Sequence, residues 1–166
     1  MNQATEPIRL LFVCMGNICR SPTAEGVMRG LLREQGLEDG IEVDSAGTGD
    51  WHAGAQPDER ATAAARSRGI TLEGAARLVG GGDFDEFDLI LAADSRNLRD
   101  LRAAAPPGSR ARLHLLREFD PASEGAPDLD VPDPYYGGDD GFERVLDLVE
   151  AACRGLLDAL RADGRL

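Results

Sequence analysis

The residues with the clearest chemical potential lie near the N-terminus, where Cys14 and Arg20 are separated by five residues. A cysteine thiolate is a strong nucleophile, and the planar guanidinium of arginine binds two phosphate oxygens at once. Gly16, between them, can adopt the backbone angles that a tight loop around an anion requires. Successive backbone N–H groups in such a loop bind an anion and also favour a thiolate. The spacing therefore predicts a loop that binds phosphate and directs sulfur at phosphorus.

A second candidate group lies far along the chain, in the segment Val131-Pro132-Asp133-Pro134-Tyr135-Tyr136-Gly137-Gly138. Asp133 stands between two prolines, which restrict the backbone and hold the carboxyl group in place. Breaking a phosphate ester requires a proton donor for the leaving oxygen, and a nearby phosphate anion favours the protonated acid. We therefore expect Asp133 to act as the general acid and then to activate water against a phosphocysteine.

The loop that starts at Cys14 needs an element on each side to position it. Residues 8–13 are an apolar run rich in strand formers and predict a first strand. Ser21-Pro22 predicts a helix start, because Ser is a good N-cap and Pro is accepted at the first helical position, and Gly36 ends the helix. A loop between a strand and a helix N-terminus gains the field of the helix dipole for anion binding.

The rest of the chain alternates between strand and helix patterns. Further strands are expected at 41–46, 88–93 and 112–116, with helices over 57–69, from Asp94 or Ser95 to Ala104, and along an apolar stripe from Phe142 to Leu160. Residues 47–56 and 117–140 are expected to be loops. This alternation predicts one α/β domain over 1–166, with a parallel sheet, helices on both faces and a flexible tail at 1–6. In such sheets ligands bind beyond the carboxyl ends of the strands.

Composition excludes several classes of function. The formal net charge of -12 disfavours nucleic acid and anionic membranes as partners. No segment approaches the roughly 20 apolar residues of a membrane span, and the N-terminus lacks the pattern of a signal peptide. Three cysteines do not suggest a disulfide scaffold, so we expect a cytoplasmic protein, with secretion lacking a signal peptide left open. His52 and His114 lie far apart in sequence, and we expect no metal and no cofactor.

Several motifs together resemble the low-molecular-weight protein tyrosine phosphatase family. The run Cys14–Pro22 is similar to the family's phosphate loop, and Asp133-Pro134-Tyr135 is similar to its general-acid motif. Ser45-Ala46-Gly47-Thr48, and Asp94 followed by Asn97-Leu98-Arg99-Asp100-Leu101, extend the resemblance over nearly the whole chain. The family implies a four-stranded parallel sheet flanked by helices, and hydrolysis of phosphotyrosine and small aryl phosphates through a phosphocysteine.

The resemblance also assigns roles to particular residues. Cys14 is the implied nucleophile, Arg20 the phosphate ligand and Asp133 the general acid. The implied phosphate-binding and substrate-binding residues are Met15, Gly16, Asn17, Ile18, Cys19, Ser21, Trp51 and Tyr135. Asn17, Ser21 and Ser45 are expected to fix the loop from behind, with the Ser21 hydroxyl supporting the thiolate. Trp51 and Tyr135 are expected to form opposite walls of the cleft.

Other positions have two interpretations or depart from the family. Cys19 either packs in the loop or forms a reversible disulfide with Cys14, and Cys153 is expected in the core. His52 is interpreted as structural or exposed at the surface. Many relatives have a His and a Gln where this chain has Gly74 and Leu78, so the hydrogen bonds behind the phosphate loop are expected to be looser or made differently.

Three alternative functions remain open. Phosphoarginine phosphatases tend to have Thr where this chain has the apolar Ile18. Arsenate reductases that use thiols of their own chain need cysteines downstream of the nucleophile, and here only Cys153 lies downstream of the loop. A non-catalytic phosphate-binding module would need neither Cys14 nor Asp133. The expected partners are tyrosine-phosphorylated proteins. The sequence is also compatible with a tyrosine kinase as partner, which could act on Tyr135 or Tyr136. It is compatible with a monomer or a weak dimer.

Overall fold

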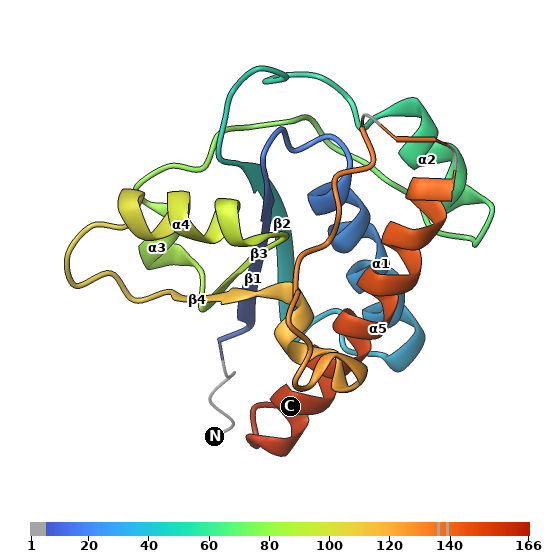
Figure 1. Cartoon of the computed structure of the whole chain (residues 1–166). Coiled ribbons are helices and arrows are strands. Elements are labelled where there is room, and N and C mark those ends of the chain that lie inside the picture. Colours follow the sequence, from blue (N-terminus) through green and yellow to red (C-terminus); the bar gives the residue numbers. More distant parts are fainter. Residues whose placement is uncertain (1–5, 136, 139) are drawn as a thin grey trace.

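Four parallel strands form the centre of the molecule in the computed structural model, which describes residues 6–135, 137–138 and 140–166 (Figure 1). Their order across the sheet is β2 (Ile41–Gly47), β1 (Ile8–Cys14), β3 (Leu89–Ala92) and β4 (Arg112–Leu115). Because β1 is an inner strand, its last residue, Cys14, emerges between the carboxyl ends of β2 and β3. This edge of a parallel sheet is where ligands bind.

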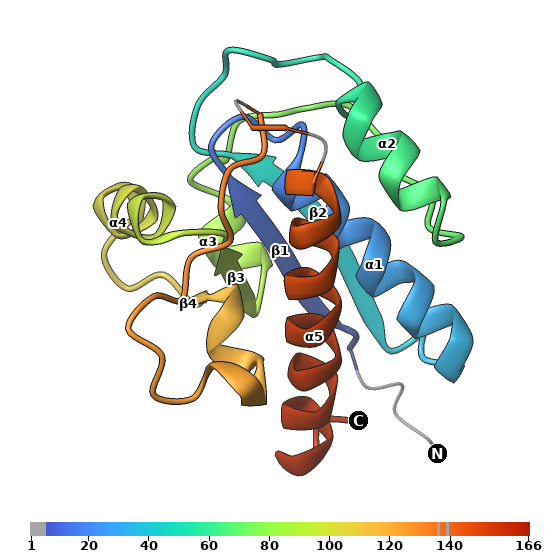
Figure 2. The same ribbon diagram turned by 45° about the vertical axis from the view of Figure 1, so that its right-hand side comes forward.

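Helices cover both faces of the sheet, as the sequence predicted (Figures 1 and 2). One face carries α1 (Arg20–Gln35), α2 (Glu59–Arg66) and α5 (Asp140–Ala162), and the other carries α3 (Asp83–Glu86) and α4 (Ser95–Ala104). Successive residues of β1 point to opposite faces, so its apolar run supplies two cores. Leu10 and Phe12 join the core under α1 and α5, whereas Leu11 and Val13 join the core under α3 and α4.

The start of α1 differs from the prediction. The helix begins at Arg20, and Cys19 occupies the N-cap position without a side-chain cap. Ser21 is therefore inside the helix and does not cap it, so that predicted role is wrong. Its hydroxyl instead contacts Cys14 and Asn17. The predicted end of the helix is confirmed, because Gly36 has the left-handed φ of 69° typical of a C-terminal glycine.

The second predicted helix is shorter than expected. It spans Glu59–Arg66, and Asp58 caps it by accepting hydrogen bonds from the backbone N–H groups of Arg60 and Ala61 at 2.8 and 3.2 Å. The short helix α3 was not predicted, because four residues are too few to show helical periodicity.

The segment 117–140, expected to be a loop, contains short 3-10 helices within its described part. These are η1 (Leu116–Phe119), which takes up the end of the predicted fourth strand, and η2 (Pro121–Ser123). Residues 1–5 of the predicted tail lie outside the described residues. Within the ranges that the structure describes, no helix combines the length and apolar character needed to cross a membrane.

Candidate active site

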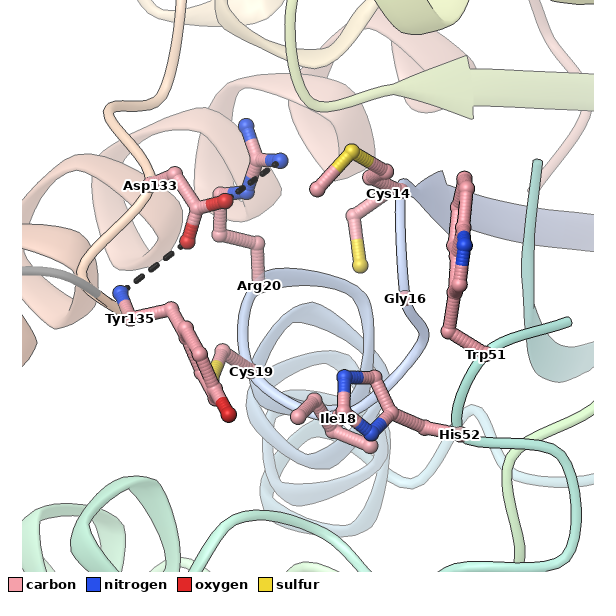
Figure 3. Close-up of a pocket in the computed structure, with 10 residues that line it drawn as sticks. Cys14, Gly16, Ile18, Cys19, Arg20, Trp51, His52, Asp133 and Tyr135 are labelled. Atoms are coloured by element: carbon pink, nitrogen blue, oxygen red, sulfur yellow. Dashed lines mark hydrogen bonds and ion pairs between the residues drawn. The ribbon is translucent and has the colours of Figure 1, made fainter. Parts of the chain in front are cut away.

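A cavity of about 410 Å³ opens at the carboxyl end of β1 (Figure 3). Its lining combines the loop after β1, the loop after β2 and the segment before α5. The lining residues are Cys14, Met15, Gly16, Ile18, Cys19, Arg20, Trp51, His52, Asp133 and Tyr135. The structure thus brings residues from three distant segments of the sequence to one site.

The loop after β1 curls around the sulfur of Cys14. The backbone N–H of Asn17 donates to Cys14 Sγ at 3.3 Å, and Ser21 Oγ lies 3.0 Å from the same sulfur. Asn17 has a left-handed φ of 58°, a conformation that Asn tolerates better than most residues. This turn directs the N–H of Asn17 back toward the sulfur, so one backbone N–H and one hydroxyl contact the thiol.

Asn17 also fixes the loop from behind. Its Nδ2 donates to Ser21 Oγ at 2.8 Å and to Ser45 Oγ at 3.0 Å, and its Oδ1 accepts from the backbone N–H of Arg77 at 2.9 Å. The Ser45 hydroxyl donates in turn to Glu25 Oε1 at 2.7 Å. All polar atoms of the buried Asn17 side chain are therefore satisfied, and the loop is joined to α1, β2 and the segment before α3.

The segment with the family departures lies directly behind this network. A cavity of about 80 Å³ there is lined in part by Asn17, Ser45 and Gly74. Main-chain groups supply the neighbouring hydrogen bonds: the N–H of Arg77 binds Asn17, and its C=O accepts from the N–H of Gly47 at 2.8 Å. Leu78 pairs with Gly47 in an isolated bridge, and its side chain is half exposed. On this side of the network, the backbone of Arg77 therefore makes the hydrogen bonds to Asn17 and Gly47 beside a small cavity.

Arg20 is held against the cavity by oxygens on three segments. Its Nη1 donates to Asp94 Oδ2 at 2.6 Å and to the carbonyl of Val131 at 3.0 Å, and its Nη2 lies 3.7 Å from Asp133 Oδ2. Burial lowers the pKa of this guanidinium, but the opposing effect of Cys14 and Asp94 is larger, so the pKa lies above its usual value. Arg20 is therefore a fixed cation beside the thiol.

The sequence placed Asp94 at the start of a helix and in a motif of the family, and the structure gives it two tasks. One of its oxygens accepts from the backbone N–H of Asn97 at 2.7 Å and caps α4, while the other binds Arg20. Its position directly after a buried strand was the available signal, since the carboxyl end of β3 lies beside that of β1.

Asp133 faces the cavity from the opposite side to Cys14 (Figure 3). Its Oδ1 accepts from the backbone N–H of Tyr135 at 3.0 Å, which orients the carboxylate toward Arg20. The side chain is 30% exposed, so water can reach it. A carboxyl group in this position can exchange a proton both with a ligand in the cavity and with solvent.

Two aromatic side chains stand on opposite sides of the opening (Figure 3). Trp51 is 71% exposed with its ring over Gly49, and Tyr135 is 37% exposed. His52 also lines the cavity, packed against Gly16 and with its ring 5.9 Å from that of Tyr135, a position that the sequence analysis did not assign to it. Its position beside Trp51 in the loop after the second strand was the signal that could have found it.

The two other cysteines have different surroundings. Cys19 is buried and lines the cavity, and burial together with the charge of Asp58 raises the pKa of its thiol to about 12. Cys153, in α5, is buried in the core, as predicted, and burial raises the pKa of its thiol as well. All three cysteines are free, so the Cys14–Cys19 disulfide stays a prediction.

The fold and the site together define a class of protein. A thiol in a strand-loop-helix turn contacts a backbone N–H and a hydroxyl, a buried guanidinium stands beside it, and a carboxyl group faces it across the cavity. Such a site can bind a phosphate group in line with a sulfur nucleophile, which is the arrangement of a cysteine-dependent phosphatase. Within the described part of the chain, no group of three His, Cys, Asp or Glu side chains could hold a metal ion.

Comparison with known proteins identifies the family. Residues 9–166 match the family model described as low molecular weight phosphotyrosine protein phosphatase. The low molecular weight protein-tyrosine-phosphatase of Streptomyces coelicolor is 51% identical over 154 residues, covering 92% of this chain and 93% of that protein. The chain therefore belongs to the low molecular weight phosphotyrosine protein phosphatase family.

Solved structures agree with this assignment. A crystal structure of the protein tyrosine phosphatase from Entamoeba histolytica, with Hepes in its active site, has a TM-score of 0.88 and 39% identity, covering 96% of this chain and 99% of that chain. The drosophila arginine phosphatase DARP has a TM-score of 0.84 and 31% identity, covering 92% of this chain and 97% of its own. The fold is thus similar both to tyrosine phosphatases and to an arginine phosphatase.

Proposed function

We propose that this protein is a protein tyrosine phosphatase that hydrolyses phosphotyrosine in proteins, and small aryl phosphates, through a phosphocysteine. The observation that carries the proposal is the position of Cys14 Sγ, 3.3 Å from the N–H of Asn17 and 3.0 Å from the Ser21 hydroxyl, in a cavity that Arg20 and Asp133 also line. Nucleophile, phosphate ligand and acid thus share one cavity.

In the first step, the Cys14 thiolate attacks phosphorus and forms the S–P bond as the bond from phosphorus to the tyrosyl oxygen breaks. Asp133 gives its proton to that oxygen, so the product leaves as neutral tyrosine. The backbone N–H groups of the loop and the guanidinium of Arg20 bind the equatorial oxygens and stabilise the transition state. Meanwhile Asp94 and Val131 keep Arg20 in place through Nη1, and the phosphate binds Nη2, which the general acid Asp133 faces at 3.7 Å.

In the second step, water attacks the phosphocysteine. The carboxylate of Asp133 takes a proton from this water, the S–P bond breaks, and inorganic phosphate leaves with the thiolate regenerated. Asp133 returns to its acid form and is ready for another cycle. One carboxyl group can serve both steps because it both faces the cavity and remains accessible to solvent.

Ser21 supports the leaving thiolate. Its oxygen accepts a hydrogen bond from Asn17 Nδ2 at 2.8 Å, and its own hydrogen can point either to the sulfur 3.0 Å away or to the carbonyl of Ala46 at 3.4 Å. A thiolate has no proton to donate, and therefore Ser21 must be the donor in the reactive state. This bond stabilises Cys14 both before attack and after the S–P bond breaks.

The walls of the cavity favour an aryl ester. Trp51 and Tyr135 offer ring faces on both sides of the opening, and Ile18 adds apolar surface to the lining. A phenyl ring gains stacking there that the short side chain of phosphoserine cannot reach. The likeness to an arginine phosphatase keeps phosphoarginine as the alternative substrate. Arsenate reduction is less favoured, since Cys153 is buried in the core and the cavity is lined by other residues.

Tyrosine-phosphorylated proteins are the proposed partners. A tyrosine kinase acting on the same proteins, or on Tyr135, fits the same proposal, whereas Tyr136 lies outside the described residues. A reversible disulfide between Cys14 and Cys19, a cytoplasmic location and a monomeric or weakly dimeric state remain parts of this proposal.

The test is phosphate release from matched phosphotyrosine, phosphoserine and phosphoarginine substrates. Phosphotyrosine turnover should disappear in Cys14→Ser and fall about a hundredfold or more in Asp133→Ala, as general-acid loss predicts. Faster turnover of phosphoarginine than of phosphotyrosine would contradict the assigned substrate but keep the nucleophile. Full activity of Cys14→Ser would refute the mechanism.

A further inference from the structure

Arg60, in the first turn of α2, contacts the segment that carries the general acid. Its Nη2 donates to the carbonyl of Tyr135 at 3.2 Å, and its guanidinium carbon lies 5.6 Å from the centre of the Tyr135 ring. The same group lies 4.8 Å from the centre of the buried Phe142 ring in α5. Arg60 therefore contacts both the acid segment and α5.

The other side of Arg60 is joined to the phosphate loop through Asp58. The carboxylate of Asp58 accepts from Arg60 Nε at 3.3 Å and Nη2 at 3.2 Å. The backbone N–H of Asp58 donates to the carbonyl of Ile18, inside the phosphate loop, at 2.9 Å. Burial raises the pKa of Asp58, but hydrogen bonds from Arg60 and from the N–H of Ala61 outweigh it and hold that pKa below its usual value. The pair therefore remains ionic at neutral pH.

A continuous chain of hydrogen bonds results between the two catalytic segments. It runs from Ile18 through Asp58 and Arg60 to the carbonyl of Tyr135, and the N–H of the same Tyr135 holds Asp133 Oδ1 at 3.0 Å. The position of the acid thus depends on the backbone of Tyr135, and Arg60 binds that backbone.

We propose that Arg60 is a positioning residue that holds Asp133 at the right distance from the phosphate loop by fastening Tyr135 to Asp58. The inference rests on the proposed role of Asp133 as general acid. Arg60 does not line the cavity, so it acts through Tyr135 and Asp133 and not on the substrate. Proton transfer is sensitive to such placement, because a shift of about 1 Å can cost a hundredfold in rate.

The side chain at position 60 has to be arginine for this task. Its planar fork binds Asp58 and the Tyr135 carbonyl together, while its guanidinium lies within cation–π distance of the rings of Tyr135 and Phe142. Lysine has one ammonium group and cannot make these contacts at the same time. The side chain is 44% exposed, so its loss should affect the position of the acid more than global stability.

The test compares aryl phosphates whose leaving phenols differ in acidity. Phenyl phosphate needs protonation of a phenol about as weak as tyrosine, whereas 4-nitrophenyl phosphate releases a far more acidic phenol and depends less on the acid. Arg60→Met, which keeps helix propensity, should lower kcat/KM about tenfold on phenyl phosphate and less than threefold on 4-nitrophenyl phosphate. Arg60→Lys should keep more than half of the loss in kcat/KM that Arg60→Met shows on phenyl phosphate.

Two comparisons identify the cause. Arg66→Met removes an exposed arginine from the same helix and should behave as wild type. In an Asp133→Ala background, Arg60→Met should lower kcat/KM by less than twofold, because the carboxyl group that Arg60 positions is absent. If Arg60→Met fails to fold in a thermal melt, Asp58→Asn weakens the same link while Asn keeps the helix cap, and the same leaving-group pattern is expected.

Equal losses on both substrates, or a full additional loss in the Asp133→Ala background, would overturn the positioning role. A raised KM with unchanged kcat would instead make Arg60 a substrate contact and also overturn it. The proposed function fails separately, when wild type releases no phosphate or when Asp133→Ala shows no dependence on the leaving group. A third result refutes only the inference about Arg60. In that case wild type is active and Asp133→Ala shows the expected loss of kcat/KM, but Arg60→Met has the kcat/KM of wild type.

Discussion

Replacing Asp94 by Asn tests how the structure holds its phosphate-binding arginine. Asp94 binds Arg20 Nη1 at 2.6 Å with one oxygen and caps α4 with the other. Asn offers only one oxygen, and its amide group would face either the N–H of Asn97 or the guanidinium, both of which are donors. The substitution therefore removes the charge and leaves one of these two groups without its acceptor.

The structure sets the expected size of the effect. Exposed ion pairs contribute about 1 kcal/mol at most, whereas removing one partner of a buried pair costs about 3–5 kcal/mol. The side chain of Arg20 is 4% exposed and that of Asp94 is 20% exposed, which puts this pair near the buried limit. Arg20 keeps its bond to the carbonyl of Val131, so we expect Asp94→Asn to lower the free energy of unfolding by about 2–3 kcal/mol.

Urea unfolding and steady-state kinetics measure this prediction. A loss of that size corresponds to a melting temperature lower by about 5–10 °C in a chain of this length. Because Arg20 loses its main anchor, kcat/KM on an aryl phosphate should fall by about tenfold to a hundredfold.

Two further variants separate the ion pair from the cap. Ser is a good N-cap but is too short to reach Arg20, so Asp94→Ser should lose the pair and keep the cap. Asp94→Ala loses both and should be less stable than Asp94→Ser by about 1 kcal/mol. The reasoning is wrong if Asp94→Asn unfolds within about 0.5 kcal/mol of wild type and keeps its kcat/KM, because the pair would then contribute as little as a surface ion pair.

Three other predictions follow from single contacts. A Cβ at Gly49 would lie 1.6 Å from the Trp51 ring, so Gly49→Ala should displace this exposed ring. The variant should have a raised KM for aryl phosphates and an altered fluorescence of the chain's one Trp, with a stability change below about 1 kcal/mol. An unchanged KM would contradict a role for the ring in binding. A Cβ at Gly155, in α5, would lie 1.7 Å from the carbonyl oxygen of Phe119, in η1. Gly155→Ala should therefore lower the free energy of unfolding, measured in urea, by about 2 kcal/mol or more, although helix propensity alone predicts stabilisation. A gain in stability would show that α5 and η1 move apart freely. The raised pKa of Cys19, about 12 against the usual 9.0, leaves on the order of a thousandfold less thiolate below pH 9 than an exposed cysteine has. In a variant without the nucleophilic thiol, iodoacetamide should therefore label Cys19 at pH 8 only after unfolding, and rapid labelling of the folded protein, followed by mass spectrometry, would contradict the burial of this thiol.

Much of the fold followed from local pattern. The apolar run of β1 and the spacing from Cys14 to Arg20 are contiguous in sequence, so their strand, loop and helix could be predicted without any knowledge of packing. Errors occurred where elements were short or where a side chain had two possible partners. The four residues of α3 show no periodicity, and Ser21 has the residue type of an N-cap although its hydroxyl bonds within the site.

The candidate site divides in the same way. The sequence by itself determined which groups could perform the chemistry, because a thiol, a guanidinium and a carboxyl group keep their reactivity in any fold. Only the tertiary structure decided how these groups are held: Asp94 reaches Arg20 across 74 positions, and Arg60 reaches Tyr135 across 75. Such contacts depend on which strand ends adjoin and on how α2 packs beside α5, and no local pattern of residues encodes them.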